Sequence, residues 1–275
     1  MQTSVRRKPS PATSYAVIIP SKNGEATIEQ TLQSIVSQVV PPNQIIVIDD
    51  ASTDATPQIL KRFPQATIIR LEHNLPRDFS RVRGLVNLGL SRVSEPCSYV
   101  MISGDDSLYP DNYVQVLLEE FEKDRRLFVC SGIHTKQKIL DEATPYGSGR
   151  MIRYSFLKQV LPIPDSVGWE GWVVFKARQM GGQVKRVQTV SYRHLRSYGS
   201  STLWAFGQGM YELGYPFWFV LARVVKNIVF EPNKLQQLTM LGGFIEFKLK
   251  RKHKLDVADF VVKNQIDRIR RLVVR

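Results

Sequence analysis

Strand-length apolar runs alternate with helical patterns through the first half of this chain. The runs lie at 15–20, 44–48, 66–71, 98–103 and 127–132, and they are mainly hydrophobic, as expected of strands buried in a sheet. Apolar residues at helical spacing between them predict helices at about 28–36, 55–63, 79–93 and 112–123. Such alternation predicts an α/β fold, with a mostly parallel Rossmann-like sheet that has helices on both faces.

Polar residues follow three of these predicted strands directly. Pro20 and Ser21 end the first strand, Asp49 and Asp50 end the second, and Asp105 and Asp106 follow the fourth. In a parallel sheet the carboxyl ends of the strands share one edge, and ligands bind in the crevice outside that edge. The three polar groups therefore predict a single ligand site.

The adjacent carboxylates of Asp105 and Asp106 repel each other and are costly to remove from water. A divalent cation relieves that cost, and Mg²⁺ typically shares one or two carboxylates with the phosphates of a substrate. A solvated Asp-Asp turn is the alternative interpretation of these two residues taken alone. The coincidence of three polar groups at one edge favours the metal site.

The loop 21–25 argues against two common nucleotide sites. It lacks the G-x-G-x-x-G pattern of dinucleotide folds, and the chain has no G-x-x-x-x-G-K-[ST] motif. A bound diphosphate must then be neutralised in another way. A metal held by Asp105 and Asp106 is the natural candidate, with Arg81 or Arg83 as helpers; a solvated helix face is the alternative for either arginine.

Together these features resemble the start of family 2 glycosyltransferases, which have the GT-A fold. The matching segments are 17–25 (VIIPSKNGE), 31–35 (TLQSI), 46–54 (IVIDDASTD), 87–89 (NLG) and 104–106 (GDD), the last followed by Pro110. The resemblance extends over 15–201. It implies an inverting transfer of a sugar from a nucleoside-diphosphate sugar to a hydroxyl group of a saccharide or lipid-linked acceptor, in the synthesis of cell-envelope or extracellular polysaccharide or glycolipid.

The resemblance also implies roles for individual residues, which are carried over position by position. Pro20, Ser21 and Asn23 match the loop that lines the nucleotide, Asp50 matches the carboxylate that hydrogen-bonds the base, Arg81 lies where a basic residue approaches the diphosphate, Asp105 matches the ribose-side carboxylate, and Asp106 matches the metal ligand of the D-x-D element. Asp105 is a second candidate ligand of the metal, which is expected to be Mg²⁺ or Mn²⁺.

Two positions depart from the family pattern. Ser103 stands where the family often has Asp, which leaves the division of labour between Asp105 and Asp106 open. Val86 stands where the family often has Arg, so that one cation near the nucleotide is either missing or supplied from elsewhere.

Glu170 is the candidate catalytic base. Inverting transfer needs a carboxylate near the acceptor hydroxyl, and neighbours that partly desolvate it raise its proton affinity. Glu170 lies between two tryptophans and stands where the family has the Asp of a Glu-Asp pair, with Trp169 in place of the Glu. A helix N-terminus that favours an acidic residue is the alternative, and Asp165 is the reserve candidate. A role for His194 in the segment 192–194 stays open.

The net charge of +13 favours anionic partners. Nothing in the chain resembles a nucleic-acid motif, so no nucleic-acid partner is expected. Cys97 and Cys130 form no framework or metal motif and are expected to be reduced thiols, which predicts a cytoplasmic location. The polar segment 1–14 carries three cations and two prolines and is predicted to be a disordered basic tail.

From about residue 202 the chain becomes rich in aromatic residues and then in cations. The region 202–275 is predicted to be a helical appendage to the catalytic domain 15–201. Aromatic residues beside cations favour a helix at the surface of an anionic membrane, which would place the protein peripherally on the inner face of the cell membrane. A helical cap with a solvated basic face is the alternative.

The sequence therefore predicts a metal-dependent glycosyltransferase. A non-catalytic sugar-nucleotide or membrane-binding module of the same fold is the alternative, and the departures at Trp169 and Val86 are what support it.

Overall fold

The computed structural model describes residues 13–73, 79–135, 147–196, 200–230 and 235–273. The chain divides into two compact units, one formed by Met1–Pro162 with Gly181–Arg196 and the other by Ile163–Met180 with Ser197–Arg275. Residues 163–180 thus belong with the C-terminal helices, whereas composition alone places the boundary at 201. Most of the predicted tail, residues 1–12, lies outside the described residues.

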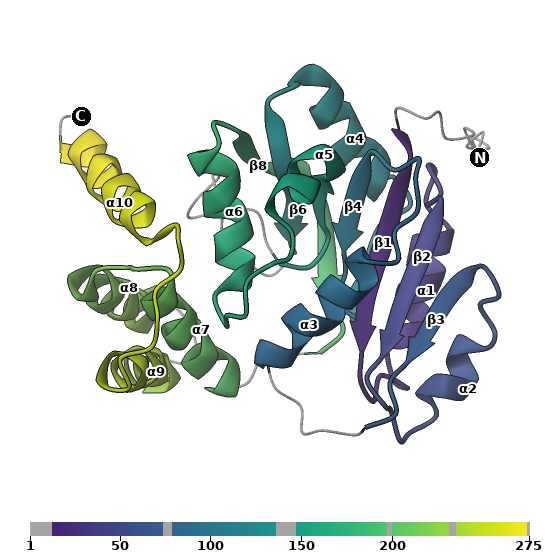
Figure 1. Ribbon diagram of the computed structural model, residues 1–275, viewed down its shortest axis with the longest axis horizontal. Coiled ribbons are helices and arrows are strands. Elements are labelled where there is room, and N and C mark those ends of the chain that lie inside the picture. Colours follow the sequence, from purple (N-terminus) through teal and green to yellow (C-terminus); the bar gives the residue numbers. More distant parts are fainter. Residues whose placement is uncertain (1–12, 74–78, 136–146, 197–199, 231–234, 274–275) are drawn as a thin grey trace. The chain divides into compact units, whose positions relative to one another are not determined.

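The described part of the first unit contains a sheet of eight strands (Figure 1). Its order is β3-β2-β1-β4-β7-β6-β8-β5. The strands are β1 (Tyr15–Ser21), β2 (Gln44–Asp49), β3 (Ala66–Arg70), β4 (Tyr99–Ile102), β5 (Ser107–Leu108), β6 (Leu127–His134), β7 (Arg150–Arg153) and β8 (Gln183–His194). The α/β class predicted from the alternating pattern is confirmed.

The parallel half of this sheet brings the predicted polar groups to one edge. β1 pairs in parallel with β2 on one side and with β4 on the other, and β2 pairs in parallel with β3. In this register Ser21 is opposite Asp49, and Ile18 is opposite Ile102. The carboxyl ends of β1, β2 and β4 therefore lie at the same edge of the sheet.

The other half of the sheet is mixed, which the sequence pattern did not predict. β7 runs antiparallel to β4 and β6, β8 runs parallel to β6, and β5 pairs antiparallel with the end of β8. The pairing of β5 with β8 brings His194 opposite Ser107, directly after the Asp105–Asp106 pair. A distant part of the chain thus reaches the predicted site.

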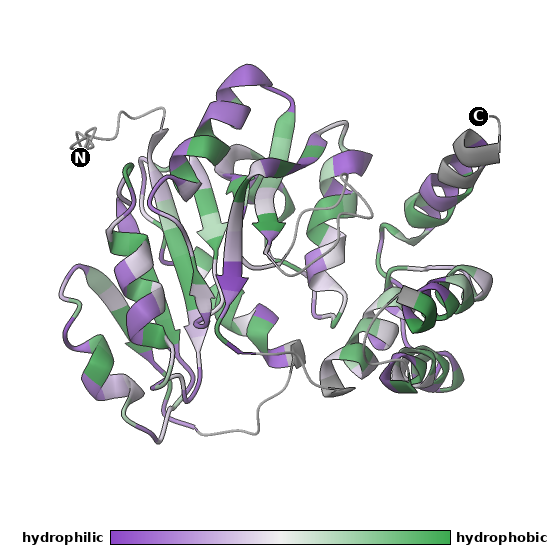
Figure 2. Cartoon of the chain, turned by 180° about the vertical axis from the view of Figure 1, so that it is seen from behind, coloured by the Kyte–Doolittle hydropathy of each residue, from purple (hydrophilic) through white to green (hydrophobic). Residues whose placement is uncertain are grey.

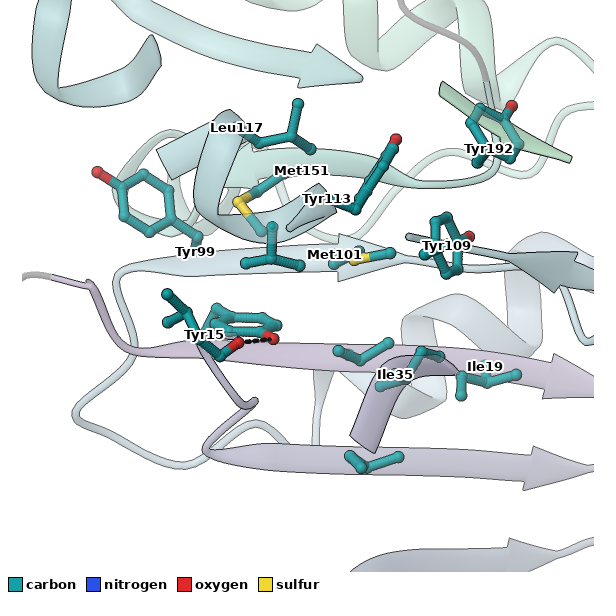
Figure 3. Packing of buried hydrophobic residues seen from close by; sticks show 14 of the residues in the cluster. Tyr15, Ile19, Ile35, Tyr99, Met101, Tyr109, Tyr113, Leu117, Met151 and Tyr192 are labelled. Carbon is teal, nitrogen blue, oxygen red and sulfur yellow. Dashed lines mark hydrogen bonds between the residues drawn. The ribbon is translucent and has the colours of Figure 1, made fainter. Parts of the chain in front are cut away.

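Helices cover both faces of the sheet (Figure 1). They are α1 (Ile28–Val36), α2 (Thr56–Leu60), α3 (Phe79–Leu90), α4 (Tyr113–Lys123) and α5 (Tyr154–Val160). The main apolar core joins the strands to α1 and α4 and is shown in Figure 3, where the hydroxyl of Tyr15 donates to the backbone oxygen of Val40 at 2.7 Å. On the opposite face α3 comes so close that a Cβ at Gly89 would lie 2.5 Å from Ile18.

The second unit is helical. Its helices are α6 (Trp169–Gln179), α7 (Ser200–Glu212), α8 (Phe217–Phe230), α9 (Leu238–Leu249) and α10 (Ala258–Val273), with a short 3₁₀ turn η2 (Leu235–Gln237) before α9. α7 and α9 cross at glycines, since a Cβ at Gly207 would lie 1.9 Å from the backbone oxygen of Met240. Among the described helices, none combines the length and apolar character that a membrane span requires.

Bonds within the second unit explain why α6 belongs to it. The indole nitrogen of Trp172 donates to Asp256 at 2.5 Å, and Lys176 lies 2.6 Å from the other oxygen of that carboxylate. The buried hydroxyl of Ser166 donates to Glu212 at 2.7 Å. These polar contacts tie both ends of the segment 163–180 to the C-terminal helices.

Candidate active site

Asp105 joins two loops at the carboxyl edge of the sheet. The hydroxyl of Ser21 donates to Oδ2 of Asp105 at 2.9 Å, and the hydroxyl of Thr31 donates to its backbone oxygen at 3.0 Å. Both Ser21 and Asp105 are buried. The loop after β1 and the loop after β4, which are far apart in sequence, are therefore joined directly at the predicted site.

Gly24 makes this approach of the two loops sterically possible. A Cβ at this position would lie 2.8 Å from Oδ2 of Asp105 and 2.9 Å from Oγ of Ser21, closer than real Cβ contacts allow. The glycine in the segment VIIPSKNGE is thus required by packing against Asp105 rather than by a phosphate-binding turn.

The side chain of Asn23 ties the β1 loop to the β2 loop. Its Oδ1 accepts a hydrogen bond from the backbone of Thr53 at 2.9 Å, and its own backbone nitrogen donates to the hydroxyl of Ser52 at 2.9 Å. Asn23 and Ala51 both have positive φ, of 49° and 50°, so the two loops turn sharply where they meet. Asn23 therefore holds the β1 loop against the β2 loop. Pro20, the third residue predicted to line the nucleotide, is partly buried in β1 opposite Ile48.

Asp50 and Arg81 form a partly buried ion pair at the same edge, in which Asp50 is the buried partner. Nε of Arg81 lies 2.8 Å and 2.9 Å from the two carboxylate oxygens of Asp50, and Nζ of Lys22 lies 3.6 Å from Oδ2. The hydrogen bond to Asp50 raises the pKa of the Arg81 guanidinium above its ordinary value. Arg81, predicted to approach a diphosphate, is thus brought onto the carboxylate predicted to bind the base.

Arg196 is the site residue that sequence reasoning missed. Its guanidinium contacts Oδ1 of Asp105 through Nη2, and its Nε lies 3.3 Å from Oδ2 of Asp106. The signal for Arg196 in the sequence was weak, because this residue lies outside the segment 192–194, two positions after its end. Its contact with the acidic pair depends on the unpredicted pairing of β5 with β8.

His194 also lies against the acidic pair. Its Nδ1 is 3.2 Å from Oδ1 of Asp106 and 3.2 Å from the hydroxyl of Ser107, while its ring stacks on that of His134 at a centroid distance of 5.1 Å. The imidazole is thus held in place by a ring on one side and polar groups on the other. This geometry leaves a role for His194 at the acidic pair open, as the sequence did.

The donor chemistry of the acidic pair suits a divalent cation. One oxygen from each of Asp105 and Asp106 contacts the guanidinium of Arg196, so both carboxylates face the same cationic side chain. Within the described ranges, no group of three or more His, Cys, Asp or Glu residues is arranged to hold a metal. A metal bound here would take its remaining ligands from a substrate's phosphates or water, as Mg²⁺ commonly does.

Glu170 is in the first turn of α6 and belongs to the second unit. It is partly buried, and its neighbours Trp169 and Trp172 are both buried. Asp165, the reserve candidate for the base, is exposed in the loop before α6. Residues one and two positions apart on a helix do not face each other, so the apolar surroundings predicted for Glu170 from these tryptophans stay a prediction.

Comparison with known proteins places these features in a family. The family model described as Glycosyl transferase family 2 matches residues 16–178. The minor teichoic acid biosynthesis protein GgaA of Bacillus subtilis (strain 168) is 29% identical over 134 residues, which cover 46% of this chain. Poly-beta-1,6-N-acetyl-D-glucosamine synthase of Staphylococcus epidermidis is 29% identical over 124 residues, or 43% of this chain. The aligned segments span 27% and 28% of these two relatives.

A solved structure supports the fold. The mannosyltransferase PcManGT from Pyrobaculum calidifontis, solved in complex with GDP-Man and Mn²⁺, has a TM-score of 0.62 and 16% sequence identity, with 94% of this chain and 81% of that chain covered. The predicted GT-A architecture is therefore confirmed. Because the family model matches more than half of its length, this chain belongs to glycosyl transferase family 2.

Proposed function

We propose that this chain transfers a sugar, with inversion, from a nucleoside-diphosphate sugar to a hydroxyl group of its acceptor. The observation that carries the proposal is the convergence of Ser21, Asp50 and the Asp105–Asp106 pair on one edge of the sheet, with Arg81 and Arg196 beside the carboxylates. Acidic groups beside fixed cations at this edge suit a ligand with hydroxyl and diphosphate groups.

The nucleotide is assigned to the crevice lined by the β1 and β2 loops. Asp50 is fixed in place by Arg81, so that its orientation is set before a base arrives. Asp105 is held through Oδ2 by Ser21, and its Oδ1, which contacts Arg196, would take a ribose hydroxyl or a cation in place of that contact. Asn23 and Gly24 keep the two loops at the spacing that these contacts need.

Asp105 and Asp106 would hold a Mg²⁺ or Mn²⁺ ion, which when bound supplies positive charge to the departing diphosphate. Arg196 lies at the same position and would supply a further cation for the diphosphate once it no longer neutralises the acidic pair. Arg196, two residues after the end of β8, is thereby proposed as the cation supplied from elsewhere in place of the one missing at Val86.

Glu170 is proposed as the base that takes the proton from the acceptor hydroxyl as that oxygen attacks the anomeric carbon. Its partial burial in the first turn of α6 supports this role. The relatives named for teichoic acid and polysaccharide synthesis support an acceptor that belongs to cell-envelope or extracellular polysaccharide or glycolipid synthesis. We place the enzyme in the cytoplasm, at the inner face of the membrane.

Calorimetric titration with UDP, GDP and dTDP, each with and without Mn²⁺, tests the donor half of the proposal. One nucleotide should bind in a metal-dependent way to the wild type, and Asp106→Asn should lose that dependence. Glu119→Gln, an exposed residue of α4, is the matched control and should bind as the wild type does. If no nucleotide binds under any metal, the proposed donor site is wrong.

A radiolabel transfer assay separates the enzyme from the alternative module. A protein that binds the nucleotide with the predicted metal dependence, yet transfers no sugar to water or to any saccharide or lipid-linked acceptor, would favour the non-catalytic interpretation. The departures at Trp169 and Val86 are the sequence features on which that alternative rests.

A further inference from the structure

Helix α8 has apolar residues on two different faces. One face, with Val220 and Val224, is buried in the small core of the second unit against Met210, Met240 and Phe244. The other face carries a row of exposed apolar side chains at one-turn spacing with an adjacent tryptophan. We call this row the α8 stripe: Phe217, Trp218, Leu221, Val225 and Val229, whose exposed fractions range from 42% to 61%.

The α8 stripe is unusual for a surface helix. A surface helix normally presents one apolar stripe to the core and polar residues to water, whereas a helix that is apolar nearly all round is expected to be covered on all sides. A contiguous exposed patch of this kind marks a site of interaction more often than a free surface. Figure 2 shows hydrophobic residues along most of α8 and the neighbouring α9.

Cations border the α8 stripe. Lys226 is exposed on α8 beside the stripe, and Nζ of Lys248 lies 5.7 Å from the ring centroid of Phe217. Lys248 begins an exposed basic run that continues with Lys250, Arg251, Lys252 and Lys254 at the end of α9. The sequence has no acidic residue in 217–230 or in 248–255. The stripe is therefore apolar at its centre and positive at its rim.

We propose that the α8 stripe binds the surface of an anionic lipid bilayer, with α8 lying in the plane of the interface. Apolar and aromatic residues would enter the boundary between headgroups and acyl chains, and the cations would contact acidic headgroups. With 14 residues, α8 is too short to cross a bilayer, which needs about 20. The proposal goes beyond the transfer reaction, because it requires neither a nucleotide nor a metal.

Charge disfavours a second copy of this chain as the occupant. A symmetric dimer through the stripe would bring the same surface of both copies together, so that Lys226 and Lys248 would meet a like-charged rim. The acidic headgroups of a bilayer offer the opposite charge over the same surface. Charge complementarity therefore favours an anionic membrane over a second copy of the chain as the partner of the stripe.

Vesicle flotation tests this proposal. The full chain without nucleotide would be mixed with vesicles of pure phosphatidylcholine or with vesicles that contain about 30 mole per cent phosphatidylglycerol, a composition with a strongly negative surface. The wild type should float with the anionic vesicles and bind them at least about tenfold more tightly than the neutral ones. The double substitution Leu221→Glu and Val225→Glu should abolish flotation.

Two further variants make the outcome decisive. Ile68→Glu places the same charge on a side chain of β3 with a similar exposed fraction, 37%, and should leave flotation unchanged. Lys226→Gln with Lys248→Gln should weaken binding to anionic vesicles by roughly tenfold and leave binding to neutral ones unaltered. Circular dichroism checks that every variant is folded, and if the double Glu variant unfolds, Val225→Glu alone replaces it.

Three results would overturn the proposal. The first is that the folded wild type does not float with anionic vesicles, and the second is that the stripe variant floats as well as the wild type. The third is a wild-type dimer in solution that Val225→Glu converts to a monomer, which would assign the stripe to a second copy. A failure of nucleotide binding would leave the flotation result intact, so the two proposals fail separately.

Discussion

Arg81 holds Asp50 through both carboxylate oxygens, with Nε 2.8 Å from one and 2.9 Å from the other. Asp50 is buried, so without Arg81 its charge would lie away from water with, among the described residues, only the more distant Lys22, at 3.6 Å, to offset it. The pair couples the end of β2 to helix α3 across 31 positions of sequence. We therefore expect Arg81 to act on the proposed nucleotide site through Asp50.

Replacing Arg81 by Gln should weaken both folding and nucleotide binding. The loss of the charged partner of a buried carboxylate should lower the free energy of unfolding by about 2 kcal/mol. Affinity for the nucleotide should fall because Asp50 is no longer held in one orientation. Chemical denaturation and calorimetric titration measure the two effects. Arg92→Gln, a substitution of an exposed arginine just after α3, should change neither, and an unaltered nucleotide affinity in Arg81→Gln would contradict the coupling.

Replacing Arg196 by Gln should raise the affinity of the protein for Mn²⁺ in the absence of nucleotide. The guanidinium now neutralises Asp105 and Asp106, and its removal leaves two carboxylates that repel each other and attract a cation more strongly. An increase of about fivefold is expected, in line with about 1 kcal/mol for a partly exposed charge. Electron paramagnetic resonance of free Mn²⁺ measures it. Arg196→Lys keeps the charge and should stay near the wild-type value, and weaker Mn²⁺ binding in Arg196→Gln would rule out the competition.

Gly24 and Gly84 offer a matched pair of glycine substitutions. A Cβ at Gly24 would collide with the Ser21–Asp105 contact, whereas a Cβ at Gly84, within α3, meets nothing within 4 Å. Gly24→Ala should therefore destabilise the protein by about 1–3 kcal/mol and weaken nucleotide binding. Gly84→Ala should stabilise it by about 0.5–1 kcal/mol, because alanine favours the helix. Thermal unfolding measures both, and equal shifts in the two variants would contradict the steric explanation.

The parallel half of the sheet could be predicted because each of its features is local. Apolar runs such as 15–20 mark buried strands, and the topology of crossovers then brings Ser21, Asp50 and Asp105 to one edge. The antiparallel strand β7 could not be predicted, because its sequence Arg-Met-Ile-Arg is short and has a charged residue at each end. Its buried apolar centre is evident only from its neighbours β4 and β6.

The contacts between charged residues at the site were beyond sequence reasoning for a related reason. Asp105 and Arg196 are 91 positions apart, and their meeting depends on the register of β5 against β8. Asp50 and Arg81 were each singled out from the sequence. The family resemblance, however, assigned them to different parts of a ligand, the base and the diphosphate, rather than to each other. Local patterns identify chemically active residues, but pairings between them follow from tertiary contacts.

Acid should destabilise the second unit partly through Glu246. Hydrogen bonds from Lys250, Gln208 and Trp204 lower the pKa of this carboxyl from its ordinary value of 4.5 to about 2. Because the folded state favours the ionised form, its stabilising contribution is complete above about pH 4.5 and is lost as the pH falls toward about 2. Glu246→Gln should therefore flatten the loss of stability over this range. Acid unfolding followed by tryptophan fluorescence measures the slope, and identical slopes in wild type and variant would contradict the assignment.

Glu170→Gln should separate chemistry from binding. The amide keeps the size of the side chain and its place in the first turn of α6, but it cannot accept the proton of the acceptor hydroxyl. Transfer should fall by at least about a hundredfold, as expected when a general base is removed, while the dissociation constant of the nucleotide stays unchanged. Asp165→Asn is the matched control, because Asp165 is exposed in the loop before the same helix and was the reserve candidate. Loss of transfer in Asp165→Asn with full activity in Glu170→Gln would reassign the base to Asp165.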